Sequence, residues 1–139
     1  MISFQLTADL EASAKLTFEN MAPYYAHYGV DWECSKIHEQ IVSLENWDVL
    51  YNGEVVGAIR LAYDGDDCWL RDLQVSGEYQ NKGIGAAALS EVERLAHNKG
   101  SRRMWLRVFK ISPARNLYLR SGFVMDREEE RFHYMCKEL

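Results

Sequence analysis

The stretch LRDLQVSGEYQNKGIGA, residues 70–86, decides the fold of this chain. The apolar run from Leu70 to Val75 predicts a strand that stops at a glycine turn, and the residues after that turn predict the start of a helix. A helix N-terminus that follows such a loop attracts anions, because its first backbone N–H groups have no intrahelical partner and the helix dipole favours negative charge. Gly83 and Gly85 carry no Cβ, so a phosphate group can approach their backbone closely.

Two other phosphate-binding loops fit this sequence poorly. A P-loop ends in Gly-Lys-Ser/Thr, but Lys82 precedes the first glycine here and no hydroxyl residue follows the second. A dinucleotide-binding Rossmann loop needs an acidic residue about 20 positions later, at the end of the next strand. The next strand ends instead in Arg107-Val108-Phe109. The sequence therefore disfavours both kinds of nucleotide site.

Two motifs indicate a family. Gln80-x-x-Gly83-x-Gly85-Ala86 resembles the acetyl-CoA signature of the GNAT superfamily of N-acetyltransferases, [Arg/Gln]-x-x-Gly-x-[Gly/Ala]. The stretch SPARNLYLRSGF, from Ser112 to Phe123, resembles the second GNAT element, N-P-A-x-x-L-Y-x-x-x-G-F. The two motifs stand in the family's order, with a helix and a strand of suitable length between them. The resemblance covers the chain from about Val55 to its C-terminus.

The resemblance implies acetyl-CoA as co-substrate. Amides of the glycine-rich loop would hold the pyrophosphate, and backbone amides near Leu73 and Val75 would bind the pantetheine arm and polarise the thioester carbonyl. Ser112 stands where relatives carry an asparagine, so Asn116 is a candidate to replace that contact. The residues expected at the cofactor are Leu73, Gln74, Val75, Gln80, Asn81, Lys82, Gly83, Ile84, Gly85, Ala86, Asn116 and Tyr118.

The resemblance also implies direct attack of an amine on the thioester, in a gap where the strands Leu70–Val75 and Met104–Phe109 splay apart. Tyr118 occupies the position of the family's general acid. Its phenol, with an ordinary pKa of roughly 10, is a suitable proton donor to the departing thiolate. The alternative is that Tyr118 only packs its helix onto the sheet.

Asp72 is the candidate general base, because a carboxylate within a Leu/Val-rich strand requires an explanation. The alternative is an ion pair between Asp72 and Arg71, Arg107 or an arginine of another strand. A water chain in place of a protein base is a further alternative.

The acceptor site is expected near a group of four aromatic residues: Tyr24, Tyr25, Tyr28 and Trp32. These side chains can wall an amine pocket through cation–π contacts or apolar burial. Alternatively, they pack the N-terminal helices onto the sheet. The acceptor is expected to be a primary amine of a small molecule or peptide, and the sequence does not identify it.

Composition limits the remaining possibilities. The 139 residues carry a net charge of −5, which disfavours a broad nucleic-acid-binding face and fits a cationic acceptor. The three cysteines lie far apart, and neither they nor the four histidines have the spacing of metal ligands, so we expect reduced thiols, a cytoplasmic location and no metal. No leader or membrane-spanning segment is expected.

The order of elements predicts an α/β (α+β) fold in one domain, residues 1–139, with a mixed sheet of about seven strands and about four helices. The expected order is β-α-α-β-β-β-α-β-α-β-β. The first helix is expected over Asp9–Asn20, ending near Pro23, with the aromatic group following in a non-helical segment. The aromatic strand Phe132–Cys136 is expected to present an open edge for a homodimer.

A second function class remains open at this point. The chain fits a non-catalytic, acyl-CoA-binding or regulatory domain that keeps the same fold without turnover.

Overall fold

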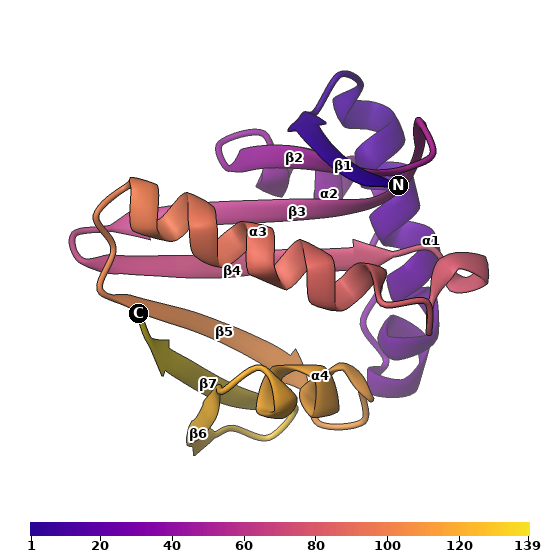
Figure 1. Ribbon diagram of the computed structural model, residues 1–139. Helices are drawn as coiled ribbons and strands as arrows, with labels where there is room; N and C mark the ends of the chain where they lie inside the picture. The colour runs from indigo at the N-terminus through magenta and orange to yellow at the C-terminus, as the bar shows by residue number, and fades with distance from the viewer.

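The computed structural model describes residues 1–139 and is built around one sheet. Its strands are β1 (Ile2–Leu6), β2 (Glu45–Tyr51), β3 (Glu54–Asp64), β4 (Asp67–Val75), β5 (Arg103–Phe109), β6 (Val124–Glu128) and β7 (Phe132–Glu138). The spatial order is β1-β2-β3-β4-β5-β7-β6, and every neighbouring pair is antiparallel except β4 and β5 (Figure 1). The mixed sheet of seven strands confirms the predicted fold class.

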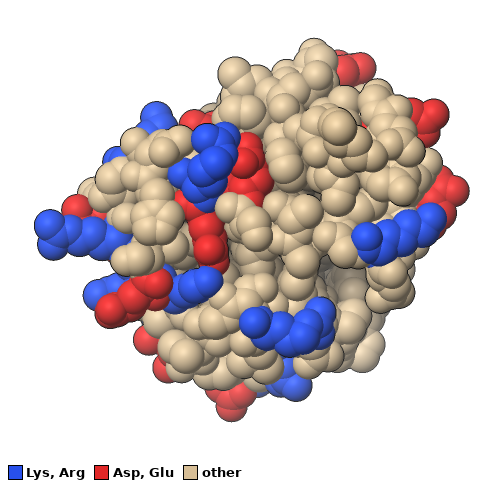
Figure 2. Space-filling view, in the orientation of Figure 1, with Lys and Arg blue, Asp and Glu red and all other residues tan.

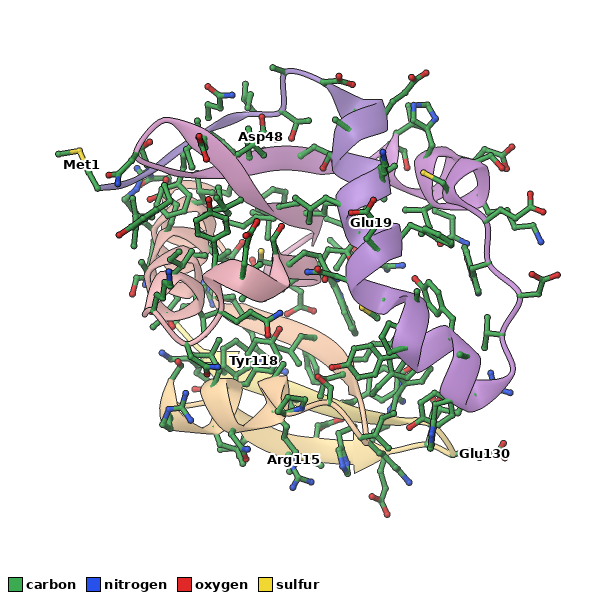
Figure 3. All side chains as sticks on the ribbon, turned by 90° about the vertical axis from the view of Figure 1, so that its right-hand side faces the viewer. Met1, Glu19, Asp48, Arg115, Tyr118 and Glu130 are labelled. Atoms are coloured by element: carbon green, nitrogen blue, oxygen red, sulfur yellow. The ribbon has the colours of Figure 1, made fainter.

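Four α-helices cover the two faces of this sheet. They are α1 (Leu10–Tyr28), α2 (Cys34–Ile41), α3 (Ile84–Asn98) and α4 (Ala114–Arg120). Helices α3 and α4 lie on one face, and α1 and α2 lie on the other, as Figures 1 and 3 show from two directions. The predicted order of elements along the chain is confirmed. None of the helices combines the length and the apolar character that crossing a bilayer needs.

The first helix is longer than its sequence predicts. The predicted end near Pro23 is wrong, because α1 continues to Tyr28 and stops at Gly29, whose φ of 66° is left-handed. A proline inside a helix removes one backbone hydrogen bond, but tertiary contacts can offset this loss. Tyr24 and Tyr28 supply such contacts by stacking on Phe109 of β5, with ring centroids 5.8 and 4.9 Å apart. The predicted non-helical aromatic segment is therefore also wrong for Tyr24, Tyr25 and Tyr28.

The parallel pair β4–β5 is short. Its register runs only from Asp67 opposite Arg103 to Leu70 opposite Leu106, and beyond that point the strands diverge (Figure 1). A bulge between β3 and β4 leaves Arg71 as an extra residue, and this bends β4 away from its neighbour. The splay that the family resemblance implies is therefore present, past Leu70 and Leu106.

The main core lies between the sheet and the α3–α4 layer. Alternate residues of β5 enter this core, among them Leu106 and Val108, so Arg107 between them points to the α1–α2 face. A smaller cluster lies on that opposite face, where Ala14 of α1 packs against Ile37 and Ile41 of α2. The region in which β4 and β5 diverge therefore has one helical layer on each side.

The open edge of the C-terminal half is not the strand that the sequence predicts. The expectation of an unpaired edge at Phe132–Cys136 is wrong, because β7 lies between β5 and β6 and pairs with both. The edge strand is β6, whose residues are all exposed, including the apolar Val124 and Met125.

Candidate active site

A cavity of about 1050 Å³ occupies the region where β4 and β5 diverge. Helix α1, strand β4, the loop before α3, helix α4 and the β6–β7 turn all contribute to its wall. Most of the predicted site residues line it together: Tyr24, Tyr25, Trp32, Asp72, Leu73, Gln74, Val75, Gln80, Asn81, Gly83, Gly85, Ala86 and Tyr118. The fold thus brings residues from four separate parts of the sequence to one cavity.

The loop before α3 presents a run of unpaired backbone donors. The N–H groups from Asn81 to Ala86 donate to no backbone acceptor, and no side chain caps the helix. Gly83 and Asn81 make this possible by adopting left-handed backbone angles, with φ of 79° and 60°. Consecutive free donors at a helix N-terminus form a site for phosphate groups.

The two glycines of this loop serve different purposes. Gly83 has open space where a Cβ would stand, so its requirement is conformational. A Cβ on Gly85 would lie 3.2 Å from Cδ2 of Leu117, so this glycine lets α4 pack closely against the start of α3. Its lack of a side chain therefore supports helix packing, besides leaving the backbone accessible.

The C-terminal end of β4 is fixed by two side-chain amides. The carbonyl oxygen of Val75 accepts hydrogen bonds from Gln80 Nε2 at 2.9 Å and from Asn20 Nδ2 at 2.8 Å. The first residue of the loop motif thereby holds the loop to the strand, and α1 is held to the same point. Asn20 lines the cavity, and the sequence analysis did not identify it. No local pattern marks Asn20, because its partner Val75 lies 55 residues later in the chain.

Tyr118 points from α4 toward the sheet, as Figure 3 shows, and is 6% exposed. Its ring packs edge-on against Phe123, with centroids 5.8 Å apart. Burial, together with the nearby charge of Asp72, raises the pKa of its phenol above the ordinary value. Tyr118 therefore keeps its proton at neutral pH and can donate it into the cavity.

Asp72 forms an ion pair with an arginine of the neighbouring strand. Its Oδ2 accepts from Nη1 of Arg60 at 3.1 Å, and Arg60 is completely buried. Of the partners that the sequence suggested, the structure thus selects an arginine on another strand. The carboxylate retains 22% exposure and lines the cavity, so it is accessible to a bound molecule.

Arg60 is also the centre of a buried polar network on the α1 face. Its guanidinium donates to Ser13 Oγ at 2.6 Å, Thr17 Oγ1 at 2.7 Å and Asn46 Oδ1 at 2.9 Å. These contacts compensate the cost of burying the charge. The sequence analysis missed this residue, although a single arginine within the apolar strand VVGAIRLAY was a usable signal.

The aromatic residues have both of the roles considered from the sequence. Tyr24 lines the cavity and also stacks on Phe109, while Tyr25 lines it and stacks on Trp32 at 6.0 Å. Burial and the charge of Asp72 raise the pKa of Tyr25 to about 12. Tyr28 lies outside the cavity. Its ring stacks on Phe109 of β5 and has the guanidinium of Arg131 5.8 Å from its centroid, and its hydroxyl donates to the carbonyl oxygen of Arg131 at 3.5 Å.

Three further predicted residues lie outside the cavity. Ile84 is 1% exposed and belongs to the core, so only its backbone can contribute. Lys82 lies over the ring of Tyr79 at 5.5 Å. Asn116 is exposed on α4, and nothing in its position supports a contact with the cofactor.

Charged side chains are intermixed on the face that carries α3 and α4, without a broad patch of one sign (Figure 2). That face therefore offers no extended cationic surface to a nucleic acid. No group of three or more His, Cys, Asp or Glu side chains is placed to bind a metal ion.

Comparison with known proteins agrees with this architecture. A model of the acetyltransferase (GNAT) family matches residues 8–123, whereas no curated protein matches the sequence significantly. The PaiA N-acetyltransferase of Thermoplasma acidophilum, solved with coenzyme A, is 21% identical with a TM-score of 0.83, covering 100% of this chain and 99% of that one. A GNAT family acetyltransferase of Elizabethkingia anophelis with acetyl-CoA bound is 20% identical with a TM-score of 0.80, covering 99% and 98%. At these identities the likeness shows the fold.

Proposed function

This chain belongs to the acetyltransferase (GNAT) family, and we propose that it transfers the acetyl group of acetyl-CoA directly to a primary amine. One observation carries the proposal. The free N–H groups from Asn81 to Ala86 open on the same cavity as Tyr118 and Asp72, and this cavity lies where β4 and β5 diverge. The amides that we assign to the phosphates and the two side chains that we assign to proton transfer therefore adjoin one continuous space.

Acetyl-CoA is the proposed co-substrate, and two solved neighbours support it by containing coenzyme A or acetyl-CoA. Its pyrophosphate would bind the free amides of the loop. Its pantetheine arm would lie along β4 beyond Leu70, where the strand has no hydrogen-bonded partner on the β5 side. The amides of Leu73 and Val75 are the donors that we assign to the arm and to the thioester carbonyl.

The transfer step has a simple proton balance. The amine nitrogen forms a bond to the acetyl carbon, the carbon–sulfur bond breaks, the nitrogen loses one proton and the sulfur gains one. We assign Tyr118 as donor to the leaving sulfur, because its buried phenol lines the cavity and carries a proton at neutral pH. Asp72 is assigned as acceptor of the amine proton, because its carboxylate lines the cavity and is partly exposed.

The test is turnover of acetyl-CoA with a panel of amines, measured as release of free thiol, together with calorimetry of acetyl-CoA binding. We expect binding and amine-dependent thiol release. Binding without turnover for any amine would favour the alternative of a non-catalytic acyl-CoA-binding domain. Absence of binding would contradict the assignment of the loop.

Two further properties are proposed with the activity. We propose a cytoplasmic location, supported by three cysteines that are all free.

We also propose a homodimer that forms through the edge strand β6, whose exposed Val124 and Met125 offer apolar surface beside unpaired backbone groups. A monomer mass in light scattering at assay concentrations would contradict the second proposal.

A further inference from the structure

The charged residues that line the cavity are mostly arginines. Five arginines and two aspartates contribute to the wall, without any lysine or glutamate: Arg71, Arg107, Arg120, Arg127, Arg131, Asp64 and Asp72. Asp72 is already compensated by the buried Arg60. The cavity is therefore cationic, although the whole chain carries a net charge of −5. This contrast argues against the expectation of a purely cationic acceptor.

Four of these arginines have no carboxylate partner. Arg71, Arg107, Arg120 and Arg131 take part in none of the ion pairs of the structure, although the chain has 21 acidic residues. Arg127 differs because it contacts Glu129 at 3.8 Å. A cavity with several uncompensated guanidinium groups favours an anionic occupant.

Arg107 is the best placed of the four. Its guanidinium lies 4.2 Å from the centroid of Phe132, whose ring stacks in turn on Phe109 at 4.5 Å. Stacking fixes the plane of a guanidinium and leaves the N–H groups along its edge available. That edge has the geometry for two parallel hydrogen bonds to a carboxylate.

The cofactor phosphates do not account for Arg107. The free amides that would bind them belong to the start of α3, which lies on the opposite face of the sheet from Arg107. Arg107 instead shares its face with Tyr24 of α1, because its neighbour Phe109 stacks on that ring. An anionic group bound at Arg107 must therefore belong to the acceptor, which would bind on the α1 face of the sheet, and not to the cofactor.

Asp72 lies across the divergence from Arg107. Leu70 and Leu106 are the last paired residues of β4 and β5, with Asp72 two positions beyond the first and Arg107 one position beyond the second. Asp72 faces α1 through its ion pair with Arg60, so both charges lie on the acceptor face. A carboxylate and a guanidinium on opposite sides of one gap match the two charges of a zwitterion.

We propose that the acceptor is an amine that also carries a carboxylate, as an α-amino acid does, with Arg107 binding the carboxylate and Asp72 receiving the amine. The inference rests on the proposed acetyl transfer. Tyr24, Tyr25 and Trp32 line the same cavity, and they provide an apolar wall for the body of the acceptor. An amino acid with an aromatic or branched apolar side chain fits this combination of groups.

The experiment compares matched acceptors that differ only in the carboxylate. L-phenylalanine and 2-phenylethylamine form one pair, and L-leucine and 3-methylbutylamine form a second. For each acceptor, kcat/KM is measured by thiol release, and binding to the CoA-saturated protein is measured by calorimetry. The measurements are made on the wild type, on Arg107→Gln and on Arg103→Gln.

Arg103 is the matched control. It lies on the same strand and face four positions earlier, and it also covers an aromatic ring, at 5.6 Å from that of Trp105, but it does not line the cavity. We expect the amino acids to exceed their decarboxylated partners by roughly tenfold or more. Arg107→Gln should remove this preference, bringing kcat/KM for each amino acid down to that of its decarboxylated partner measured on the same variant, and Arg103→Gln should retain it.

Decarboxylated amines that react and bind as well as the amino acids would overturn the inference and leave acetyl transfer intact. Equal behaviour of Arg107→Gln and Arg103→Gln would also overturn it. If amino acids bind the CoA complex preferentially but no amine is acetylated, the proposed activity fails while the carboxylate site stands. Preference for O-phosphoethanolamine over every amino acid would contradict the carboxylate and assign the arginine to phosphate.

Discussion

Arg60 Nη1 donates to Asp72 Oδ2 at 3.1 Å between adjacent strands, and Arg60 has no exposed surface. The same guanidinium donates to Ser13 and Thr17 on α1. One buried cation therefore holds the candidate base Asp72 and helix α1, which lines the cavity, in fixed positions relative to each other.

Replacing Arg60 with Met should lower the free energy of unfolding by about 3 kcal/mol. The substitution removes the partner of Asp72 and leaves the oxygens of Ser13 and Thr17 without a donor. Urea denaturation followed by circular dichroism measures the loss. The exposed Arg103→Gln serves as control and should change stability by less than about 0.5 kcal/mol. If Arg60→Met and the wild type have equal free energies of unfolding, the polar network around Arg60 makes no net contribution to stability.

Asp72→Asn keeps the shape of the side chain and removes its charge. If Asp72 accepts the amine proton, kcat should fall by roughly 10²-fold or more. The variant should also lose up to about 3 kcal/mol of stability, because Arg60 keeps its buried charge without a counter-charge. Rates are therefore compared at a temperature where circular dichroism shows both proteins folded. A kcat near that of the wild type would exclude Asp72 as base and leave a water chain as the acceptor.

Tyr118→Phe deletes the hydroxyl and keeps the ring that packs against Phe123. We expect turnover to fall by about 10²-fold, whereas acetyl-CoA affinity should change little, because the lost interaction strengthens only as charge develops on sulfur. Stopped-flow or steady-state thiol release gives the rate, and calorimetry gives the affinity. Full turnover in this variant would show that the hydroxyl of Tyr118 is not the proton donor and that the residue only packs α4 against the sheet.

Ala86→Asp tests the phosphate site without disturbing the packing of α4. Ala86 is exposed, lines the cavity and lies in the first turn of α3, where a carboxylate suits the helix dipole. The added negative charge should weaken acetyl-CoA binding by roughly tenfold or more while the fold persists. Gly85→Asp is a less specific test, because its Cβ would also meet Leu117.

Ser90→Asp is the control for this charge, since Ser90 is exposed on the same helix but does not line the cavity. It should bind acetyl-CoA as the wild type does. If Ala86→Asp binds acetyl-CoA with unchanged affinity, the amides before α3 do not bind its pyrophosphate.

Stability should decline at alkaline pH. Burial raises the pKa of Tyr25 from 10.0 to about 12 and that of Cys68 from 9.0 to about 11. Both groups are therefore protonated in the folded and in the unfolded chain below about pH 8, and their stabilising contribution is complete there. Above that pH the unfolded chain ionises first, so the contribution is lost as pH rises toward 11 and 12. Urea midpoints between pH 8 and 11 measure the decline, and Tyr25→Phe should make it shallower. A Tyr25→Phe profile parallel to that of the wild type would contradict this account for Tyr25.

The sequence predicted the order of elements and most of the cavity wall, because both depend on local signals. Strand alternation and the two motifs are short-range patterns. The loop donors follow from glycine positions alone, and the structure places the predicted loop at the cavity.

The length of α1 and the partner of Asp72 depend instead on contacts between distant residues. Pro23 would end an isolated helix, but Tyr24 and Tyr28 bind to Phe109, more than eighty residues later in the chain. In the same way, the pairing of Asp72 with Arg60 follows from the β3–β4 register, including its bulge. Register is a tertiary property, and a sequence pattern can only offer candidate partners for such a pair.

The early end of the β4–β5 ladder has a mechanical consequence. Strands β1 to β4 form one half of the sheet, and β5, β7 and β6 form the other. At one end, the four paired positions from Asp67 to Leu70 join the halves. At the diverging end, the stacking of α1 on Phe109 bridges them. A thioester-bearing chain bound in the split would supply the strand partner that β4 lacks. The amide protons of Leu73 and Val75, which face the split, should then exchange with solvent much more slowly in the loaded protein than in the free protein. The ligand would act as a temporary eighth strand, and the rigidity of the sheet would rise and fall with each catalytic cycle.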